Sequence, residues 1–280
     1  MTNKGAKIYI TVLTLVTIAA VIFGIYFYIF RGTTVFSKAK NVSKTVSLEG
    51  DIDSIIFNMD AADLNIQYGE SASVSYNLPE DSIPDISLED GKLSVISKKN
   101  IRRFNINFFV FGNENKYDVT ITVPTGTELS DVDLTTDAGD LDLKDISTST
   151  LNIETDSGDL KLNSVFATDA TIISDSADVD FENVDFSKST IKTDAGDYKI
   201  KNSEIDDLDI ESDAGDLKID DSTIDNITAE FDTGNIKAED STINSGSCKT
   251  DVGNVNLNGN IGDVSTSTDV GDIRINGDKK

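Results

Sequence analysis

The chain has 280 residues, with 24 Lys and Arg against 50 Asp and Glu, no His, no Trp and one Cys. A formal charge of −26 repels a polyanion, which argues against nucleic-acid binding through phosphate neutralisation. The lack of His removes Ser-His-Asp triads, Cys-His nucleophile pairs and His-ligated zinc, and one Cys makes no disulfide framework.

An uncharged apolar segment occupies residues 8–30, after a polar N-terminus at residues 1–7. About 20 apolar residues cross the hydrocarbon core of a bilayer, so the segment predicts one transmembrane helix. The alternative is a cleaved signal peptide, whose apolar region is about 7–15 residues long and precedes a small-x-small site. Here the apolar run continues past Ala19-Ala20, the only candidate site, which favours an uncleaved anchor.

The next segments are a linker and an irregular β-rich region. Residues 31–45 are polar and weakly basic, as in a linker. Residues 46–135 predict a β-rich cap and the first irregular coils, with Asp90-Gly91 as a two-residue hairpin turn. The aromatic and basic segment at residues 101–116 is predicted to pack in this cap. Contact with the membrane interface or with a partner is the alternative.

A repeat governs residues 136–280. The tetrapeptide Asp-x-[Gly/Ala]-[Asp/Asn] occurs eight times, with six steps of 19 residues and a last step of 18. The first residues of these tetrapeptides are Asp137, Asp156, Asp175, Asp194, Asp213, Asp232, Asp251 and Asp269. Two apolar columns that alternate with polar residues follow each tetrapeptide, which is the period of a strand. The pattern predicts a single-stranded β-solenoid with 19-residue coils, in which each coil is stabilised by its neighbours.

The core of the predicted solenoid consists of small and medium apolar side chains. Cys248 belongs to the column that begins with Ile153 and Ile172, so it is predicted to be a small core residue rather than a nucleophile or ligand. Ala238 and Cys248 lie in the same coil, so the core is expected to narrow there. Lys161, Lys199, Lys218, Lys237 and Arg274 share an outward column and are expected to lie close to the turn carboxylates.

The repeated carboxylates have two interpretations. In the structural one, Gly supplies a positive φ angle, the first Asp caps backbone N–H groups, and Ala177 marks a different turn. In the functional one, carboxylates stacked about 4.8 Å apart repel each other and would be relieved by Ca²⁺. The candidate ligands of such a ladder are Asp137, Asp140, Asp156, Asp159, Asp194, Asp197, Asp213 and Asp216. No other cofactor is expected.

The segment TVPTGTELSDVDLTTDAGDLDLKD and the reiterated T-D-x-G-D-L-x-[LI] resemble the bacterial "putative adhesin" family of β-strand-repeat domains of unknown function. Some members of that family resemble Lia-type cell-envelope stress proteins. The resemblance covers roughly residues 46–280 and implies a right-handed β-solenoid exposed at a bacterial surface. It carries over no catalytic residues, because its motifs are structural.

These observations favour a non-enzymatic, single-pass membrane protein whose repeats form an adhesin-like or stress-associated binding or scaffold module. Its expected partners are the membrane, through residues 8–30, and an envelope component or protein. Counting of basic residues around the helix allows a cytoplasmic repeat domain, but long domains translocate largely regardless of charge, and we favour the extracytoplasmic side. The alternatives are a Ca²⁺-binding solenoid and a polysaccharide-acting enzyme that uses two opposed carboxylates.

Overall fold

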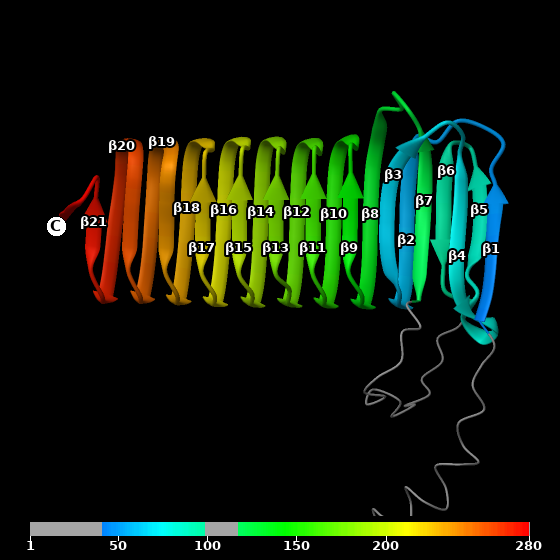
Figure 1. Cartoon of the computed structure of the whole chain (residues 1–280), viewed down its shortest axis with the longest axis horizontal. Coiled ribbons are helices and arrows are strands. Elements are labelled where there is room, and N and C mark those ends of the chain that lie inside the picture. The colour runs from blue at the N-terminus through cyan, green and yellow to red at the C-terminus, as the bar shows by residue number, and fades with distance from the viewer. Residues whose placement is uncertain (1–40, 99–116, 280) are drawn as a thin grey trace, which may run out of the picture. The chain divides into compact units, whose positions relative to one another are not determined.

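The computed structural model describes residues 41–98 and 117–279 (Figure 1). The predicted transmembrane helix at residues 8–30 and the aromatic-basic segment at residues 101–116 lie outside these residues. Within residues 41–98 and 117–279, no helix has the length and hydropathy needed to cross a bilayer. This part of the chain is all-β, with 22 strands in one hydrogen-bonded sheet and one short 3-10 helix, η2, Glu80–Ser82.

The strands fall into an irregular N-terminal set and a regular series. The irregular set is β1 Asn41–Ser47, β2 Ser54–Ala61, β3 Asp63–Gly69, β4 Ser73–Pro79, β5 Asp85–Glu89, β6 Lys92–Ile96 and β7 Asp118–Pro124. The regular series begins with β8 Leu129–Ala138, β9 Leu141–Lys144, β10 Ser147–Ser157, β11 Leu160–Asn163, β12 Phe166–Ser176, β13 Val179–Glu182, β14 Asp185–Ala195 and β15 Tyr198–Lys201. It continues with β16 Glu204–Ala214, β17 Leu217–Asp220, β18 Thr223–Thr233, β19 Ile236–Val252, β20 Val255–Val270, β21 Ile273–Ile275 and β22 Asp278–Lys279.

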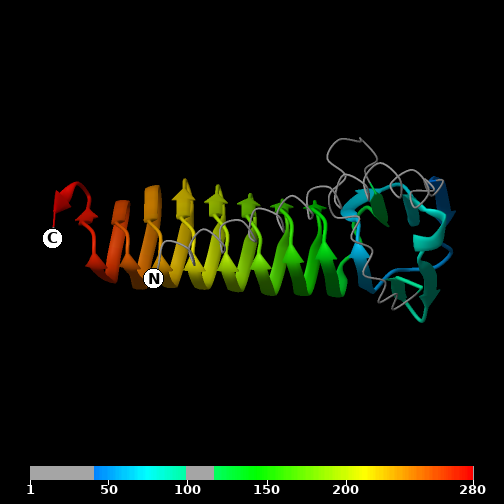
Figure 2. The same ribbon diagram turned by 90° about the horizontal axis from the view of Figure 1, so that it is seen from below.

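The regular series is the predicted β-solenoid. A full coil consists of a long strand of 11 residues and a short strand of four, and equivalent strands of neighbouring coils pair in parallel. The register between coils is the sequence repeat: Leu151 pairs with Ala170, and Leu160 with Val179. Figure 2 shows these coils side by side in one row. The 18-residue step arises from a register shift between Ala238 and Ser241, at the corner after the short strand.

The core lies between the long and short strands, where the predicted columns are buried. From Leu141 to Leu257, every residue of the two columns after the turn is at most 2% exposed. Large side chains in some columns compensate for small ones in another column of the same coil. The ring centroids of Phe181 and Phe186 lie 5.3 Å apart, edge to face, in the coil where a third core column has the small residue Ser189. Cys248 is fully buried, which confirms its prediction as a small core residue.

Two buried hydroxyl columns were not predicted. One column lies near the C-terminal ends of the long strands, just before the turn. It consists of Thr136, Thr155, Ser174, Thr193, Ser212 and Thr250, and Phe231 occupies the equivalent position in one coil. In the other, the Ser222 hydroxyl accepts a bond from the Ser203 backbone N–H at 3.1 Å and donates to the Asp220 carbonyl at 2.7 Å. The second column therefore satisfies backbone donors that would otherwise be buried without a partner.

A second corner closes each coil after the short strand. Its residue is Asp, Asn or Ser in the left-handed region, with φ between 49° and 57°. These corner residues are Asp145, Ser164, Asn183, Asn202, Asp221 and Asp240. Asn and Asp tolerate this conformation better than other residues with a Cβ, which explains why they recur there.

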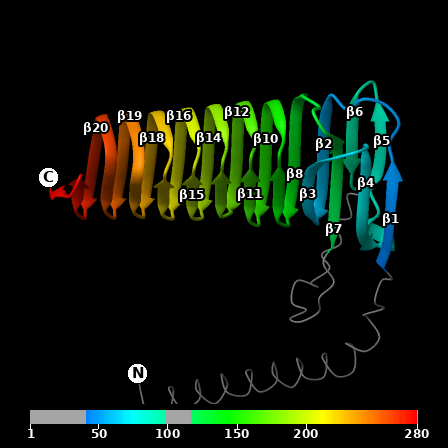
Figure 3. The same ribbon diagram turned by 45° about the horizontal axis from the view of Figure 1, so that its top comes forward.

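The N-terminal strands add further layers in an order that differs from the sequence. β2 pairs with β8 and β3 with β9, so residues 54–69 form a coil stacked directly on the first regular coil. β6 and β7 pair with the opposite edges of β2 and β3, so the coil of residues 54–69 lies between two later segments (Figure 3). Outside them, β1, β4 and β5 run antiparallel to their neighbours.

Candidate functional site

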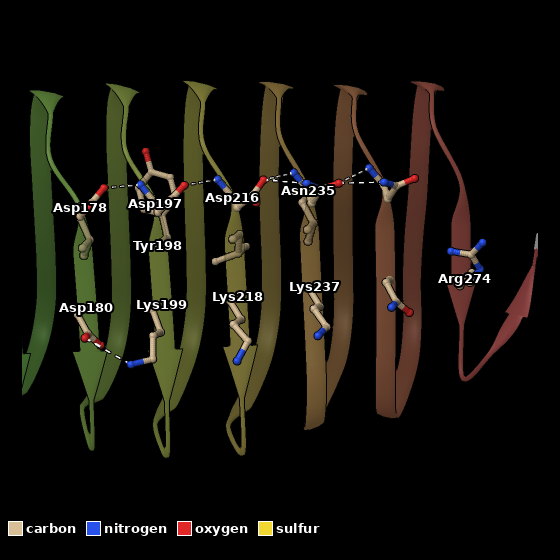
Figure 4. Close-up of a pocket in the computed structure, with 15 residues that line it drawn as sticks. Asp178, Asp180, Asp197, Tyr198, Lys199, Asp216, Lys218, Asn235, Lys237 and Arg274 are labelled. Carbon is tan, nitrogen blue, oxygen red and sulfur yellow. Dashed lines mark hydrogen bonds and ion pairs between the residues drawn. The ribbon is translucent and has the colours of Figure 1, made fainter.

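An open groove of about 650 Å³ runs across the outward face of the short strands, from β13 to β21 (Figure 4). Its polar lining residues are Asp178, Asp180, Asp197, Lys199, Asp216, Lys218, Asn235, Lys237, Asn254, Asn256 and Arg274. They belong to two columns of the repeat. We call the last residues of the tetrapeptides the turn row and the outward residues two positions later the cation row.

Side chains of the turn row bond the coils together. The Oδ1 atom of Asp197 accepts a hydrogen bond from the backbone N–H of Asp216 at 2.9 Å, and Asp216 does the same for Asn235 at 2.7 Å. Asn235 and Asn254 continue the series through their amide oxygens. The expectation that the first Asp of each tetrapeptide caps the turn is therefore wrong: the last residue accepts the N–H, because it faces the equivalent turn of the next coil.

The series begins in the N-terminal coil, where Asp63 accepts the N–H of Asp140 at 3.1 Å. Among the bonds of the described coils, it is interrupted between Asp159 and Asp178. Ala177 stands there in place of glycine, is buried, and has no left-handed φ angle. The turn at Ala177 therefore differs from its neighbours in its φ angle, and the interruption of the turn-row bonds lies beside it.

Glycine in the other turns is required by a close approach between coils. Gly215 has φ +144°, and a Cβ there would lie 1.8 Å from the carbonyl oxygen of Gly196 in the preceding coil. The same crowding recurs at Gly234, against Gly215. Stacking at the strand spacing of about 4.8 Å leaves no room for a side chain on this face of the turn.

The predicted metal ligands are distributed over two separate columns. Asp137, Asp156, Asp194 and Asp213 are exposed at the ends of the long strands, and Asp140, Asp159, Asp197 and Asp216 belong to the turn row. In the part of the chain that the structure describes, no group of three or more Asp, Glu or Cys side chains is arranged to hold a metal ion. The Ca²⁺ ladder stays a prediction. Of its turn-row members, Asp140, Asp197 and Asp216 already accept a backbone N–H from the next coil, and Asp159 pairs with Lys161.

The basic members of the cation row within the groove are Lys199, Lys218, Lys237 and Arg274, and Lys161 precedes them. Asp180 and Asn256 occupy the same column. The expected pairing with turn carboxylates holds for Lys161 with Asp159 at 3.8 Å and Arg274 with Asp272 at 2.9 Å.

The three groove lysines pair elsewhere, which corrects that expectation. Lys199 pairs with Asp180 at 3.5 Å, Lys218 with Asp220, and Lys237 with Glu239 at 2.9 Å. Residues two apart on a strand share a face, so the nearest carboxylate is often on the lysine's own strand. The hydrogen bond with Asp220 raises the pKa of Lys218.

The floor of the groove is backed by the apolar core. Tyr198 replaces the usual aliphatic residue of its column, is 1% exposed, and directs its hydroxyl to Ser212 at 2.9 Å and to Thr193. Burial raises the pKa of its phenol, so it keeps its proton at neutral pH. Burial also raises the pKa of the Cys248 thiol to about 12, which makes it a poor nucleophile.

The groove itself was not predicted from the sequence. The signal was present in the two columns that recur beside the turn, one changing from Asp to Asn towards the C-terminal end and one carrying Lys on three successive coils. In the sequence, each column by itself is only a local charge pattern. The short strands of successive coils pair in parallel and in register. This pairing places both columns on one face and extends that face over six coils.

Comparison with known proteins identifies the chain's relatives by family and fold. The family model described as Toastrack DUF4097 matches residues 52–241. No curated protein matches the sequence significantly. A crystal structure described as a "putative lipid binding protein" from Parabacteroides distasonis is 15% identical, with a TM-score of 0.53, and the match covers 86% of this chain and 96% of that one.

Two further crystal structures match over similar lengths. One is described as a "putative adhesin" from Bacteroides fragilis, with 17% identity, a TM-score of 0.40, and coverage of 85% of this chain and 98% of that one. The other is a "putative adhesin" from Parabacteroides distasonis, with 15% identity, a TM-score of 0.45, and coverage of 85% and 97%.

Proposed function

We propose that this chain, which belongs to the Toastrack DUF4097 family, is a non-catalytic, adhesin-like binding module anchored in the bacterial cell membrane. The observation that carries the proposal is the groove on the short-strand face. It is open along its length, and its turn row and cation row repeat on successive coils. A repeated open surface suits an extended ligand, because a small-molecule site usually surrounds most of its ligand.

The use of the groove carboxylates supports binding rather than catalysis. The groove contains Asp178, Asp180, Asp197 and Asp216, and three of these accept a backbone N–H from the next coil. Asp180 pairs with Lys199. A general acid or base needs a carboxyl group free to exchange its proton with a substrate, whereas these groups hold the coils together or form ion pairs.

The charge of the groove supports a partner that is polar and close to neutral. Its four carboxylates are balanced by three Lys and one Arg, although the whole chain has a formal charge of −26. The amides of Asn235, Asn254 and Asn256 add hydrogen-bonding groups at one end. An uncharged polysaccharide of the envelope or a polar peptide segment has matching donors and acceptors, whereas a polyanion would meet the field of the whole repeat domain.

Anchoring and orientation rest on the sequence. The uncharged segment at residues 8–30 is long enough to span a bilayer, and the repeats follow it after a polar linker. We place the repeats on the extracytoplasmic side. Protease treatment of intact cells should degrade an extracytoplasmic repeat domain, and protection of that domain in intact but not lysed cells would contradict this placement.

Binding is best tested with the full chain in lipid nanodiscs, using envelope polysaccharide fractions, envelope proteins and lipid vesicles as probes. The groove variant Lys199→Glu/Lys218→Glu/Lys237→Glu should weaken binding at least tenfold, because it converts three of the four cations in the cation row to carboxylates. The matched control Lys188→Glu/Lys192→Glu/Lys249→Glu makes the same change in charge at exposed positions of the long strands. Equal loss in both variants, or unchanged binding in the groove variant, would show that the groove is not the site. Release of a cleaved product from any polysaccharide would contradict the non-catalytic assignment.

A further inference from the structure

The groove changes in charge along its length. We call the part around β13, β15 and β17 the first half, and the part around β19, β20 and β21 the second half. The polar lining of the first half is four carboxylates and two lysines, a net charge of −2. That of the second half is three amides, one lysine and one arginine, a net charge of +2. The groove is therefore neutral as a whole, with two halves of opposite sign.

The turn row presents carboxylate oxygens in the first half. Asp178, Asp197 and Asp216 are exposed, and each uses Oδ1 to accept the backbone N–H of the next coil (Figure 4). Among the described residues, their Oδ2 atoms have no hydrogen-bond partner. The backbone bond thus holds each carboxylate in place and leaves one oxygen for a ligand.

In the second half, the turn row presents N–H donors instead. The Oδ1 atom of Asn235 accepts both the backbone N–H and the side-chain amide of Asn254 at 3.0 Å, and Oδ1 of Asn254 accepts the N–H of Asp272 at 2.9 Å. Each amide group donates one of its two hydrogens within the row and keeps the other. Lys237 and Arg274 add cations beside them.

Ion pairs at the margin of the groove leave this contrast in place. Lys218 pairs with Asp220 and Lys237 with Glu239, and all four residues are partly exposed. Exposed ion pairs contribute little to stability, so a ligand group can replace such a partner at small cost.

We propose that the groove binds an extended peptide segment of another protein, with cationic side chains against the first half and carboxylates against the second half. The peptide would occupy the groove of the proposed function, on which this assignment rests. A zwitterionic lipid headgroup carries both charges on one small group and cannot reach both halves. An uncharged polysaccharide makes no use of either charge.

The stacking of the coils sets the spacing of charges in the ligand. Asp197 and Asn254 belong to the middle coils of the two halves and are three coils apart, about 14 Å at a strand spacing of about 4.8 Å. An extended chain covers about 3.3 Å per residue, so the cationic and anionic side chains should be about four residues apart.

Two peptides of the same composition test this spacing. End-blocked Lys-Lys-Ser-Gly-Glu-Glu has separated charges with centres about four residues apart, whereas Lys-Glu-Ser-Gly-Lys-Glu has mixed charges. The full chain in nanodiscs of neutral lipid should bind the first peptide about fivefold more tightly in isothermal titration calorimetry, because several weak ion pairs add together. Added salt should remove the difference, because it screens exposed charges.

An isosteric change in the turn row locates the binding. Asp178→Asn/Asp197→Asn/Asp216→Asn removes three negative charges but keeps the oxygens that accept the backbone bonds, so the coils should stay stacked. An unchanged circular dichroism spectrum and urea transition would check this. The variant should bind the peptide with separated charges about fivefold more weakly.

The matched control is Asp175→Asn/Asp194→Asn/Asp213→Asn, which removes the same charge from the exposed first residues of the same tetrapeptides. These residues lie outside the groove lining, so binding should stay within about twofold. Equal binding of the two peptides, or equal loss in the two variants, overturns the ligand assignment. The proposed function still stands in that case if another probe loses affinity in the lysine-to-glutamate groove variant. If no probe depends on the groove, both fail.

Discussion

Replacing Gly215 by Ala tests whether contact between coils, rather than the backbone angle alone, requires glycine in the turns. A Cβ at this position would lie 1.8 Å from the carbonyl oxygen of Gly196 and 2.7 Å from its carbon, so one coil must move. That movement weakens the bonds from Gly196 N–H to Ala214 at 3.1 Å and from Asp216 N–H to Asp197 at 2.9 Å.

The expected loss combines two contributions. The unfavourable φ angle costs a residue with a Cβ about 1–2 kcal/mol. Each of the two weakened hydrogen bonds costs about 0.5–1 kcal/mol. We therefore expect Gly215→Ala to lower the free energy of unfolding by about 2–4 kcal/mol, measured by urea unfolding of the full chain with far-ultraviolet circular dichroism.

The control is Gly126→Ala. Gly126 also has a positive φ, +86°, but a Cβ there would meet nothing within 4 Å, so only the backbone contribution of about 1–2 kcal/mol applies. A stack of repeated coils can unfold in more than one step. The two variants must therefore be compared in the same urea-unfolding transition, with equal dependence of the unfolding free energy on urea concentration. A loss for Gly215→Ala no larger than that for Gly126→Ala would refute the reasoning.

Three further predictions concern single side chains. Asp216→Asn should be nearly neutral, because the amide oxygen still accepts the Asn235 N–H, whereas Asp216→Ala should cost about 1 kcal/mol in urea unfolding; equal losses would contradict the proposed role of the turn row. Ser189 is fully buried and its hydroxyl has no hydrogen-bond partner. Ser189→Ala should therefore raise the free energy of unfolding in urea by up to about 1 kcal/mol, and a clear decrease would contradict the lack of a partner. Cys248, with its pKa raised to about 12, should resist iodoacetamide at pH 8 in the folded chain and react in urea; rapid labelling of the folded chain would contradict its burial.

The repeat explains why so much of the solenoid was predictable. Every coil makes the same contacts with its neighbours, so the spacing of 19 residues between Leu141, Leu160 and Val179 is also the register of the parallel strands. The identity of the turn was equally clear from Asp, Gly and Asp at fixed positions. The roles of the two Asp residues in the turn were not clear from the sequence, because either could accept a backbone N–H. Only the stacking of the coils shows that the last residue of the tetrapeptide reaches the N–H of the next coil.

The candidate site was predictable only in part. The sequence placed Lys199, Lys218 and Lys237 in one outward column, but not their partners, which depend on distances across and along strands. It also left the buried hydroxyl columns unnoticed. Ser and Thr are usually exposed, so their recurrence did not indicate a position inside the core.

By itself, the sequence determined the coil length, the core columns, the position of the turns and the concentration of charge. Residues 136–280 have 12 Lys and Arg against 34 Asp and Glu, a net charge of −22 within the repeat. Only the tertiary structure decided the order of the N-terminal coils, with residues 54–69 stacked on β8 and β9 despite the long intervening segment. Neighbouring coils repeat one set of contacts and therefore leave a period in the sequence. The pairing of distant strands occurs once, and it is selected by which strand edges and apolar faces remain to be covered.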